Sequence, residues 1–214
     1  MTAVLFDLDG TLLDTLQDLT DSVNYTMAQF GCPPRTLKEV RDFIGTGARR
    51  LIAQSLPGKA DDPDLDRVLE VYQAYYKAHC QVKTGPYPGI PEALAQIRAL
   101  CPVAIVSNKP DGAVKALCKE YFPGVYALGE KSDCPRKPAP DMVHRAMKIL
   151  GAERCIYVGD SDVDIVTARN AGAKCISVTW GFRDKEVLEA AGAEHLCCRA
   201  QELPALVKAL LEEN

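Results

Sequence analysis

The sequence predicts an α/β protein in which a Rossmann-like parallel sheet carries an all-helical insertion after its first strand. Short apolar runs separated by helix-length amphipathic segments occur at residues 3–8, 103–107, 125–128, 155–158 and 175–178. Residues 15–85 show helical periodicity and contain no such run. Because Val-, Ile- and Leu-rich strands that alternate with helices are buried on both faces, the runs predict a parallel sheet covered by helices on each side.

Proline, aspartate and glycine residues predict where the helices of the α/β part begin and end. Residues 110–121 and 140–151 each open with a Pro-Asp pair, and the second of these segments closes with a glycine. A third helical segment follows the Gly159-Asp160 pair and stops at Gly172. The alternation of strands and helices therefore covers the first residues of the chain and everything after about residue 86.

The inserted segment is interpreted as helical throughout. Apolar residues recur at helical spacing from Leu16 to Phe30, and the Gly-Cys-Pro-Pro run that follows ends this helix. Further helices are expected over residues 36–43, 48–56 and 64–81. The sequence thus predicts a discontinuous α/β core of residues 1–14 and 86–214 with a helical cap of residues 15–85.

The charge balance, the cysteines and the lack of long apolar runs limit which partners and which compartment the protein is expected to have. The 214 residues carry 25 Lys and Arg against 29 Asp and Glu, for a net charge of −4, which gives no cationic field for nucleic acid or anionic lipid. Nine cysteines without a Cys-x-x-Cys pair predict free thiols in a reducing compartment. Without a signal-like or membrane-spanning run, we expect a cytoplasmic protein that is a monomer or homodimer and binds neither nucleic acid nor membrane.

Two acidic motifs each follow a predicted strand. Asp7-Leu8-Asp9-Gly10-Thr11 follows the first strand, and two carboxylates two residues apart in extended backbone share a face. The second motif, residues 159–164, holds three aspartates within five residues, a set that suits Mg²⁺. Helix capping by Asp160 or Ser161 is the structural alternative for the second motif, and the two interpretations are compatible.

Two further motifs supply a hydroxyl and an ammonium group. Ser107-Asn108-Lys109 ends the second long strand, and Lys137 lies within a proline-rich loop that restricts its backbone. Together with the acidic motifs, these groups suffice for covalent phosphoryl transfer. One Asp attacks phosphorus, its neighbour moves a proton, Mg²⁺ and Lys neutralise the phosphoryl oxygens, and Ser donates a hydrogen bond to them.

These motifs resemble the four motifs of the haloacid dehalogenase-like (HAD) hydrolases in order and spacing. The helical insertion directly after the first motif is similar to the C1 cap of that superfamily. The chain looks most like the phosphoglycolate phosphatase-like members, on the evidence of three segments: Phe43–Ala48, Ser107–Pro110 and Trp180–Arg183.

The resemblance implies roles for individual residues. Asp7 is the implied nucleophile, which forms an aspartyl-phosphate, and Asp9 is the implied general acid and then base. Mg²⁺ is implied on the Asp7 carboxylate, the Asp9 backbone carbonyl and Asp160, with Asp164 as an outer-shell or water-mediated partner. The side chains implied to hold the phosphoryl group are Thr11, Ser107, Asn108 and Lys137.

Substrate specificity is expected in the cap. Gly45-Thr46-Gly47 offers backbone N–H groups, and Arg49 or Arg50 offers a guanidinium for a second anionic group on a small phosphorylated metabolite such as phosphoglycolate. The structural alternatives are an interhelix turn for the first and a solvated helix face for the arginines.

Other functions remain open at this point. Pyrophosphatases, sugar-phosphate phosphatases and phosphomutases of the same superfamily share these motifs. A receiver-like phospho-Asp signalling domain uses similar residues, but it lacks a second Asp two residues after the first and a cap of this size.

Overall fold

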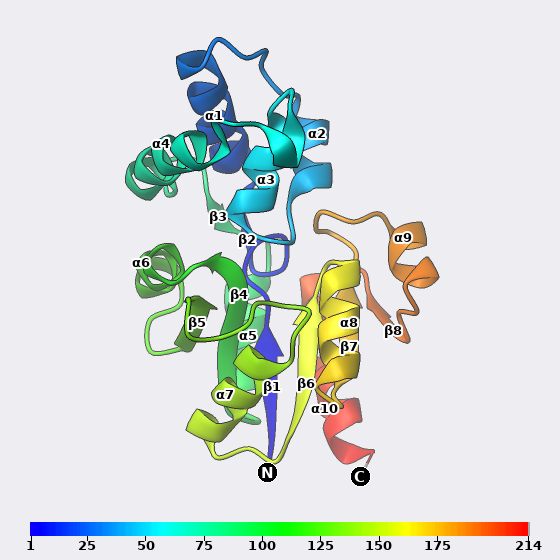
Figure 1. Ribbon diagram of the computed structural model, residues 1–214. Helices are drawn as coiled ribbons and strands as arrows, with labels where there is room; N and C mark the ends of the chain where they lie inside the picture. The colour runs from blue at the N-terminus through cyan, green and yellow to red at the C-terminus, as the bar shows by residue number, and fades with distance from the viewer. Residues whose placement is uncertain (214) are drawn as a thin grey trace. The chain divides into compact units, whose positions relative to one another are not determined.

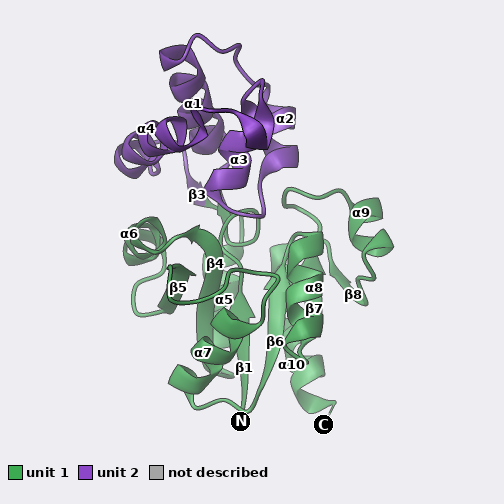
Figure 2. Cartoon of the chain, in the orientation of Figure 1, with its two compact units in different colours: residues 1–13, 86–214 green, residues 14–85 purple. Residues whose placement is uncertain are grey.

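The computed structural model describes residues 1–213, which form two compact units (Figures 1 and 2). One unit comprises residues 1–13 and 86–213, and the other comprises residues 14–85. The first boundary lies one residue before the position expected from the sequence, and the second lies where the sequence placed it. A two-stranded ribbon, β2 (Leu13–Asp14) with β3 (Gly85–Pro86), contains both points at which the chain passes from one unit to the other.

The first unit is built on a six-stranded sheet with the order β5-β4-β1-β6-β7-β8. Every neighbouring pair is parallel, so the predicted fold class is confirmed. The strands are β1 (Thr2–Phe6), β4 (Val103–Pro110), β5 (Tyr126–Glu130), β6 (Arg154–Gly159), β7 (Lys174–Val178) and β8 (His195–Cys197).

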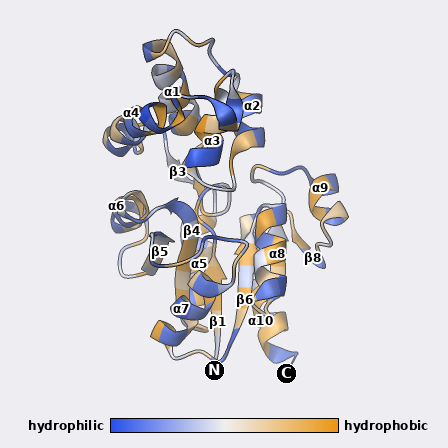
Figure 3. Cartoon of the chain, viewed as in Figure 1, coloured by the Kyte–Doolittle hydropathy of each residue, from blue (hydrophilic) through white to orange (hydrophobic). Residues whose placement is uncertain are grey.

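Helices cover both faces of this sheet and bury its alternating side chains. Val4 and Phe6 of β1 face one apolar cluster, whereas Leu5 between them faces the other. The strands accordingly stand out as the hydrophobic centre of the unit in Figure 3. Each fully buried side chain of this size stabilises the fold by roughly 1.5–3 kcal/mol. The first cluster includes residues of α5 (Ile90–Arg98), α6 (Asp111–Tyr121) and α10 (Leu203–Glu212), and the second includes residues of α7 (Asp141–Leu150) and α8 (Asp162–Asn170).

The second unit consists of helices, apart from its share of the ribbon. A capping box, in which Thr36 and Glu39 each accept a hydrogen bond from the other's backbone, starts α2. Val23, Val68 and Tyr72 are among the residues that form its buried interior. Its helices are α1 (Leu16–Gln29), α2 (Leu37–Phe43), α3 (Ala48–Ser55) and α4 (Leu65–His79), with a 3₁₀ turn at Lys59–Asp61.

The structure corrects the sequence prediction at the ends of elements and at one sheet edge. β1 ends at Phe6 and not at residue 8, and β4 runs on to Pro110 and not to 107, through an irregular register between Val106 and Pro110. The edge strand β8 and the short helix α9 (Lys185–Ala190) were not predicted, because three and six residues are too few to show a period. Within residues 1–213, no helix is long and apolar enough to span a bilayer.

Candidate active site

The candidate site lies at the carboxyl ends of three neighbouring strands. β1 sits between β4 and β6 in the sheet, and chain connections leave β1 toward one side before returning on the other. Asp7 directly follows β1, Ser107 to Lys109 belong to the end of β4, and Asp160 directly follows β6. In open α/β sheets, ligands bind at this edge, near the point where the strand order reverses. The motifs that are separated in sequence therefore meet in one place.

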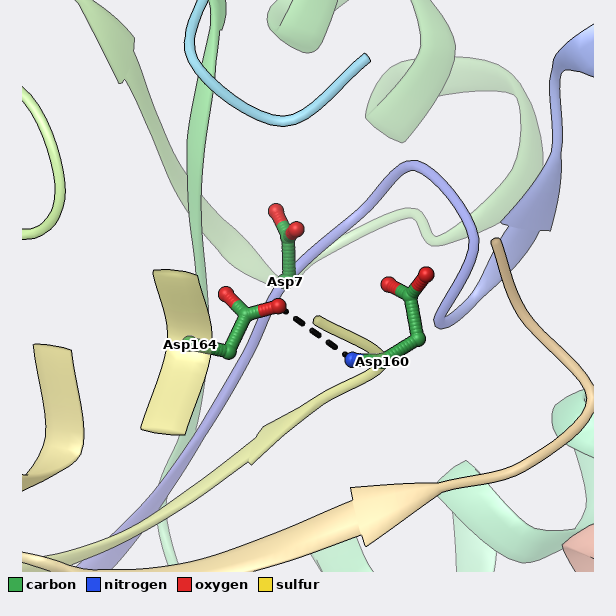
Figure 4. Close-up of side chains that lie close together, drawn as sticks. All are labelled: Asp7, Asp160 and Asp164. Carbon is green, nitrogen blue, oxygen red and sulfur yellow. Dashed lines mark hydrogen bonds between the residues drawn. The ribbon is translucent and has the colours of Figure 1, made fainter. Parts of the chain in front are cut away.

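Three carboxylates form the centre of the site (Figure 4). Asp7, Asp160 and Asp164 each offer an oxygen within 4.8 Å of the other two. Asp160 and Asp164 are almost fully buried, and the Asp7 side chain is 13% exposed. Like charges held this close and this far from water repel strongly, so the cluster requires a compensating positive charge.

Burial and mutual repulsion raise the proton affinity of two of these groups. Burial, assisted by Asp164 and Asp9 and opposed by Lys137, raises the pKa of Asp7 to about 7. Burial, assisted by Asp164 and Asp7, raises the pKa of Asp160 to about 8. Both carboxyls are thus short of positive charge at neutral pH.

The charge deficit equals that of one divalent cation. When all four are ionised, Asp7, Asp9, Asp160 and Asp164 carry four negative charges, and the ammonium groups paired with them among residues 1–213 are those of Lys137 and Lys109, which leaves two negative charges that a cation can balance in place of the bound protons. Carboxylate and carbonyl oxygens are hard ligands of the kind that Mg²⁺ prefers. The residues present therefore fit a Mg²⁺ ion.

Lys137 connects two of the carboxylates. Its Nζ lies 2.9 Å from Asp7 Oδ1 and 2.8 Å from Asp164 Oδ1, and it donates a hydrogen bond to the Tyr157 hydroxyl at 3.0 Å. The side chain is only 2% exposed. Although burial alone would lower it, the carboxylates of Asp164 and Asp7 hold the pKa of Lys137 well above its usual value. Lys137 is therefore a fixed cation beside the predicted nucleophile.

Asp164 is satisfied by protein groups on both of its oxygens. Oδ1 pairs with Lys137, and Oδ2 accepts from Ser161 Oγ at 2.6 Å and from the backbone N–H groups of Ser161 and Asp160 at 3.1 and 3.2 Å. Ser161 caps α8 in return, so the capping interpretation of this motif is confirmed. The outer-shell role of Asp164 toward a metal ion remains a prediction.

Asp160 is held from two sides. Thr11 Oγ1 donates to its Oδ1 at 2.8 Å, and the Phe182 backbone N–H donates to its Oδ2 at 2.7 Å. Gly10 and Gly181 approach so closely that a Cβ on either would lie 2.3 Å from an atom of the Asp160 side chain. The contact of Thr11 with a phosphoryl group remains a prediction, since the hydroxyl binds Asp160 here.

Asn108 and Ser107 bind neighbouring protein groups. The Asn108 amide donates to the Lys137 carbonyl at 2.9 Å and accepts from the Lys137 N–H at 2.8 Å. Ser107 Oγ accepts from the Lys109 N–H at 3.3 Å and is almost fully buried. Asn108 thereby fixes the backbone of Lys137, a role that the sequence did not indicate. The contacts of both residues with a phosphoryl group stay predictions.

Sequence reasoning missed the role of Lys109. Its Nζ lies 2.6 Å from Asp9 Oδ1. The residue stands in the Ser-Asn-Lys motif, but sequence alone does not show that its side chain turns back toward the first strand. Trp180 and Arg183 belong to the segment that resembles the family, and both contact residues of this unit. Trp180 Nε1 donates a hydrogen bond to the Thr11 carbonyl at 3.0 Å, and Arg183 forms an ion pair with Asp162 at 3.3 Å.

The predicted specificity residues belong to the second unit. Gly45, Thr46 and Gly47 form the turn between α2 and α3, and both glycines have positive φ, at 125° and 96°. Arg49 lies in the first turn of α3, where its guanidinium pairs with Asp66. The guanidinium and the carboxylate are both largely exposed, so this pair is weak. Contacts of Arg49 and of the turn with a substrate remain predictions.

The comparison with known families defines the class of protein. The model of the haloacid dehalogenase-like hydrolase family matches residues 4–178. The chain belongs to this family and is a phosphatase-type hydrolase, similar to phosphoglycolate phosphatases.

Individual relatives align with between 84% and 99% of this chain. A phosphoglycolate phosphatase of Cereibacter sphaeroides is 35% identical and aligns over 99% of this chain and all of its own length. Phosphoglycolate phosphatase 1 of Pseudomonas aeruginosa is also 35% identical, over 84% of this chain and 70% of its own. A crystal structure from Lactobacillus delbrueckii subsp. bulgaricus superposes with a TM-score of 0.88 at 40% identity, covering 96% of this chain and 97% of that one.

Proposed function

We propose that this protein is a Mg²⁺-dependent phosphatase that hydrolyses a small phosphate monoester through an aspartyl-phosphate, with phosphoglycolate as its substrate. The observation that carries the proposal is the cluster of Asp7, Asp160 and Asp164 around Lys137, which is two positive charges short of balance. Such a site attracts a dication, and the dication with Lys137 attracts a phosphate dianion.

The chain's own residues supply both chemical steps. An oxygen of Asp7 attacks phosphorus, the bond from phosphorus to the ester oxygen breaks, and that oxygen takes a proton from Asp9. Asp9 then removes a proton from water as the water oxygen attacks phosphorus. The bond from phosphorus to Asp7 breaks, which restores the carboxylate and releases inorganic phosphate. Lys137 stabilises the charge on Asp7 and on the phosphoryl oxygens throughout.

Three groups would hold Mg²⁺: the Asp7 carboxylate, the Asp9 backbone carbonyl and the Asp160 carboxylate. When bound, the ion supplies charge neutralisation of the phosphoryl oxygens. Thr11 and Phe182 restrict the Asp160 carboxylate to one orientation, and such outer contacts tune metal affinity in other proteins. Asp164 acts one step further out, through Lys137 and the backbone of residues 160 and 161.

Two grounds support phosphoglycolate as the proposed substrate, one from relatives and one from this chain's own residues. The Cereibacter and Pseudomonas relatives carry that name. The turn of Gly45, Thr46 and Gly47 and the neighbouring Arg49 provide donors for a carboxylate, the second anionic group of that substrate.

A hydrolysis screen tests the proposal. Inorganic phosphate release would be measured from phosphoglycolate, pyrophosphate, hexose phosphates and nucleotides, with Mg²⁺ and with EDTA. We expect the highest kcat/KM for phosphoglycolate and loss of turnover in EDTA. Faster turnover of pyrophosphate or a hexose phosphate would contradict the substrate, and undiminished turnover in EDTA would contradict the metal.

A further inference from the structure

A second buried lysine, Lys109, forms an ion pair with a carboxylate that Lys137 does not contact. Lys109 Nζ lies 2.6 Å from Asp9 Oδ1, and the two side chains are only 3% and 13% exposed. Lys137 instead contacts Asp7 and Asp164. Each of the two aspartates of the first motif therefore has an ammonium group of its own.

The backbone that carries Lys109 is closely packed. Its N–H donates to Ser107 Oγ at 3.3 Å, and its carbonyl lies 2.7 Å from where a Cβ of Gly129 in β5 would be. Gly129 N–H in turn donates to Asp111 Oδ1 at 3.1 Å. Gly129 of β5 therefore packs against the Lys109 backbone so closely that no side chain would fit between them. This packing restricts the position of the Lys109 backbone, from which its side chain extends.

We propose that Lys109 is a positioning residue that holds the Asp9 carboxylate in place for proton exchange with the leaving oxygen and with water. The inference rests on the proposed function, since it concerns the residue proposed there as acid and base. An aspartate side chain turns freely about two bonds, and proton transfer requires the carboxyl oxygen within hydrogen-bond reach of the reacting oxygen. An ion pair of 2.6 Å within a buried site removes that freedom.

The first step, phosphorylation of Asp7, depends on Asp9 to different degrees for different leaving groups. When the ester bond of an alkyl phosphate breaks, the leaving oxygen must take a proton from Asp9, because an alkoxide is a strong base. When the bond of p-nitrophenyl phosphate breaks, the electron pair leaves as the stable p-nitrophenolate ion and no proton is needed. A misplaced Asp9 therefore slows phosphorylation of Asp7 by an alkyl phosphate much more than by p-nitrophenyl phosphate.

Rapid-quench measurement of the first turnover tests this difference. The rate of phosphorylation of the protein would be measured in Mg²⁺ with phosphoglycolate and with p-nitrophenyl phosphate. The variants are Lys109→Met, Lys109→Arg and, as a matched control, Lys119→Met, whose lysine is exposed on α6. We expect Lys109→Met to lose about 10²-fold with phosphoglycolate and less than about threefold with p-nitrophenyl phosphate. Lys109→Arg should recover part of the loss, and Lys119→Met should match the wild type.

The outcomes separate the inference from the function on which it rests. If Lys109→Met slowed phosphorylation equally with both substrates, or with neither, the positioning role of Lys109 would be overturned. The proposed function would stand in that case, provided that the wild type hydrolyses phosphoglycolate. A wild type that hydrolyses neither phosphate ester would overturn both proposals. If Lys109→Met does not fold, Lys109→Arg decides alone, because a guanidinium of different reach should still give a larger loss with phosphoglycolate than with p-nitrophenyl phosphate.

Discussion

Both units bury a carboxylate, but they surround it differently. In the helical unit, Asp18 is 2% exposed and accepts hydrogen bonds from the backbone N–H groups of Lys83 and Thr84 and from the Thr84 hydroxyl, all at 2.8–2.9 Å. In the α/β unit, Asp7 and Asp160 lie beside further carboxylates, and burial with repulsion raises their pKa. All three carboxylates accept hydrogen bonds within their own unit, but only Asp7 and Asp160 have other carboxylates close by.

This contrast separates a structural from a functional use of buried charge. The Asp18 side chain links the first turn of α1 by hydrogen bonds to residues 83 and 84, which directly precede β3. The groups that donate to it are uncharged, and these hydrogen bonds offset the free-energy cost of burying its carboxylate. Asp7 and Asp160 keep a charge deficit that a cation and a phosphate can fill. Buried charge that the fold leaves uncompensated is a common property of catalytic sites.

Substitution of Asp7 is expected to have the largest effect on phosphatase activity. We expect Asp7→Asn to lower kcat for phosphate release by on the order of 10⁴-fold or more, because the amide is a poor nucleophile. At pH 8 the metal-free variant should unfold at the same or higher denaturant concentration than the wild type, because the substitution removes a charge that burial disfavours. Asp133→Asn, at an exposed position of the same unit, is the control for both measurements. Turnover within tenfold of the wild type would contradict the nucleophile assignment.

Asp18 should show the opposite behaviour. Asp18→Ala is expected to lower the free energy of unfolding by about 3 kcal/mol, because it leaves buried N–H groups without their charged acceptor. Asp42→Ala, which removes the exposed pair with Lys38, should leave it unchanged. Urea unfolding monitored by circular dichroism measures both. If Asp18→Ala lowered the free energy of unfolding by less than about 1 kcal/mol, Asp18 would not have the structural role that distinguishes it from Asp7.

The pH dependence of metal binding sharpens the comparison further. With the pKa of Asp7 at about 7 and of Asp160 at about 8, the metal-free folded protein holds protons that the unfolded chain has released above pH 4. Its stability therefore falls as pH rises from 4 to 8. Mg²⁺ must displace these protons, so its apparent affinity by calorimetry should fall by about tenfold or more from pH 8 to pH 6. Equal affinity at both pH values would contradict the raised pKa values.

Arg49 tests whether the exposed charges of the helical unit act on substrate. We expect Arg49→Ala to raise KM for phosphoglycolate by about tenfold with little change in kcat, because a charge-assisted contact is lost before chemistry begins. Turnover of p-nitrophenyl phosphate, which has no carboxylate, is the internal control. Unchanged KM for phosphoglycolate would remove Arg49 from the substrate site.

The smallest effect is expected at the cysteines. Burial raises the pKa of Cys118, Cys155 and Cys175 to about 12, so these thiols stay protonated at pH 8 and react slowly. Cys198 is exposed. A chromogenic disulfide reagent should modify Cys198 first, with no change in phosphatase activity. Rapid modification of Cys155 in the folded protein would show that the core of the α/β unit opens readily.

The sequence predicted the fold and the strand-end motifs because both depend on local pattern. Continuous apolar strands identify the parallel sheet, and Asp7, Lys137 and Asp160 follow strands or lie in a restrained loop. The roles of Asn108 and Lys109 were not predictable, because they depend on which way a side chain turns between strands that are distant in sequence. Asp18 was missed for a similar reason: it lies 65 residues from its Lys83 partner, and helical periodicity does not reveal such a contact.

Chemical mapping of the phosphoenzyme determines whether Asp7 is the nucleophile. Asp9→Asn would be incubated with Mg²⁺ and p-nitrophenyl phosphate, whose leaving group needs no proton from Asp9, so that only hydrolysis of the phosphoenzyme is blocked. The protein would then be quenched in acid and reduced with borohydride, which converts an acyl phosphate to an alcohol. We expect the N-terminal peptide to carry homoserine in place of Asp7, and a sample without substrate to retain the aspartate. Phosphate recovered on another residue, or unreduced Asp7 despite hydrolysis by the wild type, would contradict this expectation.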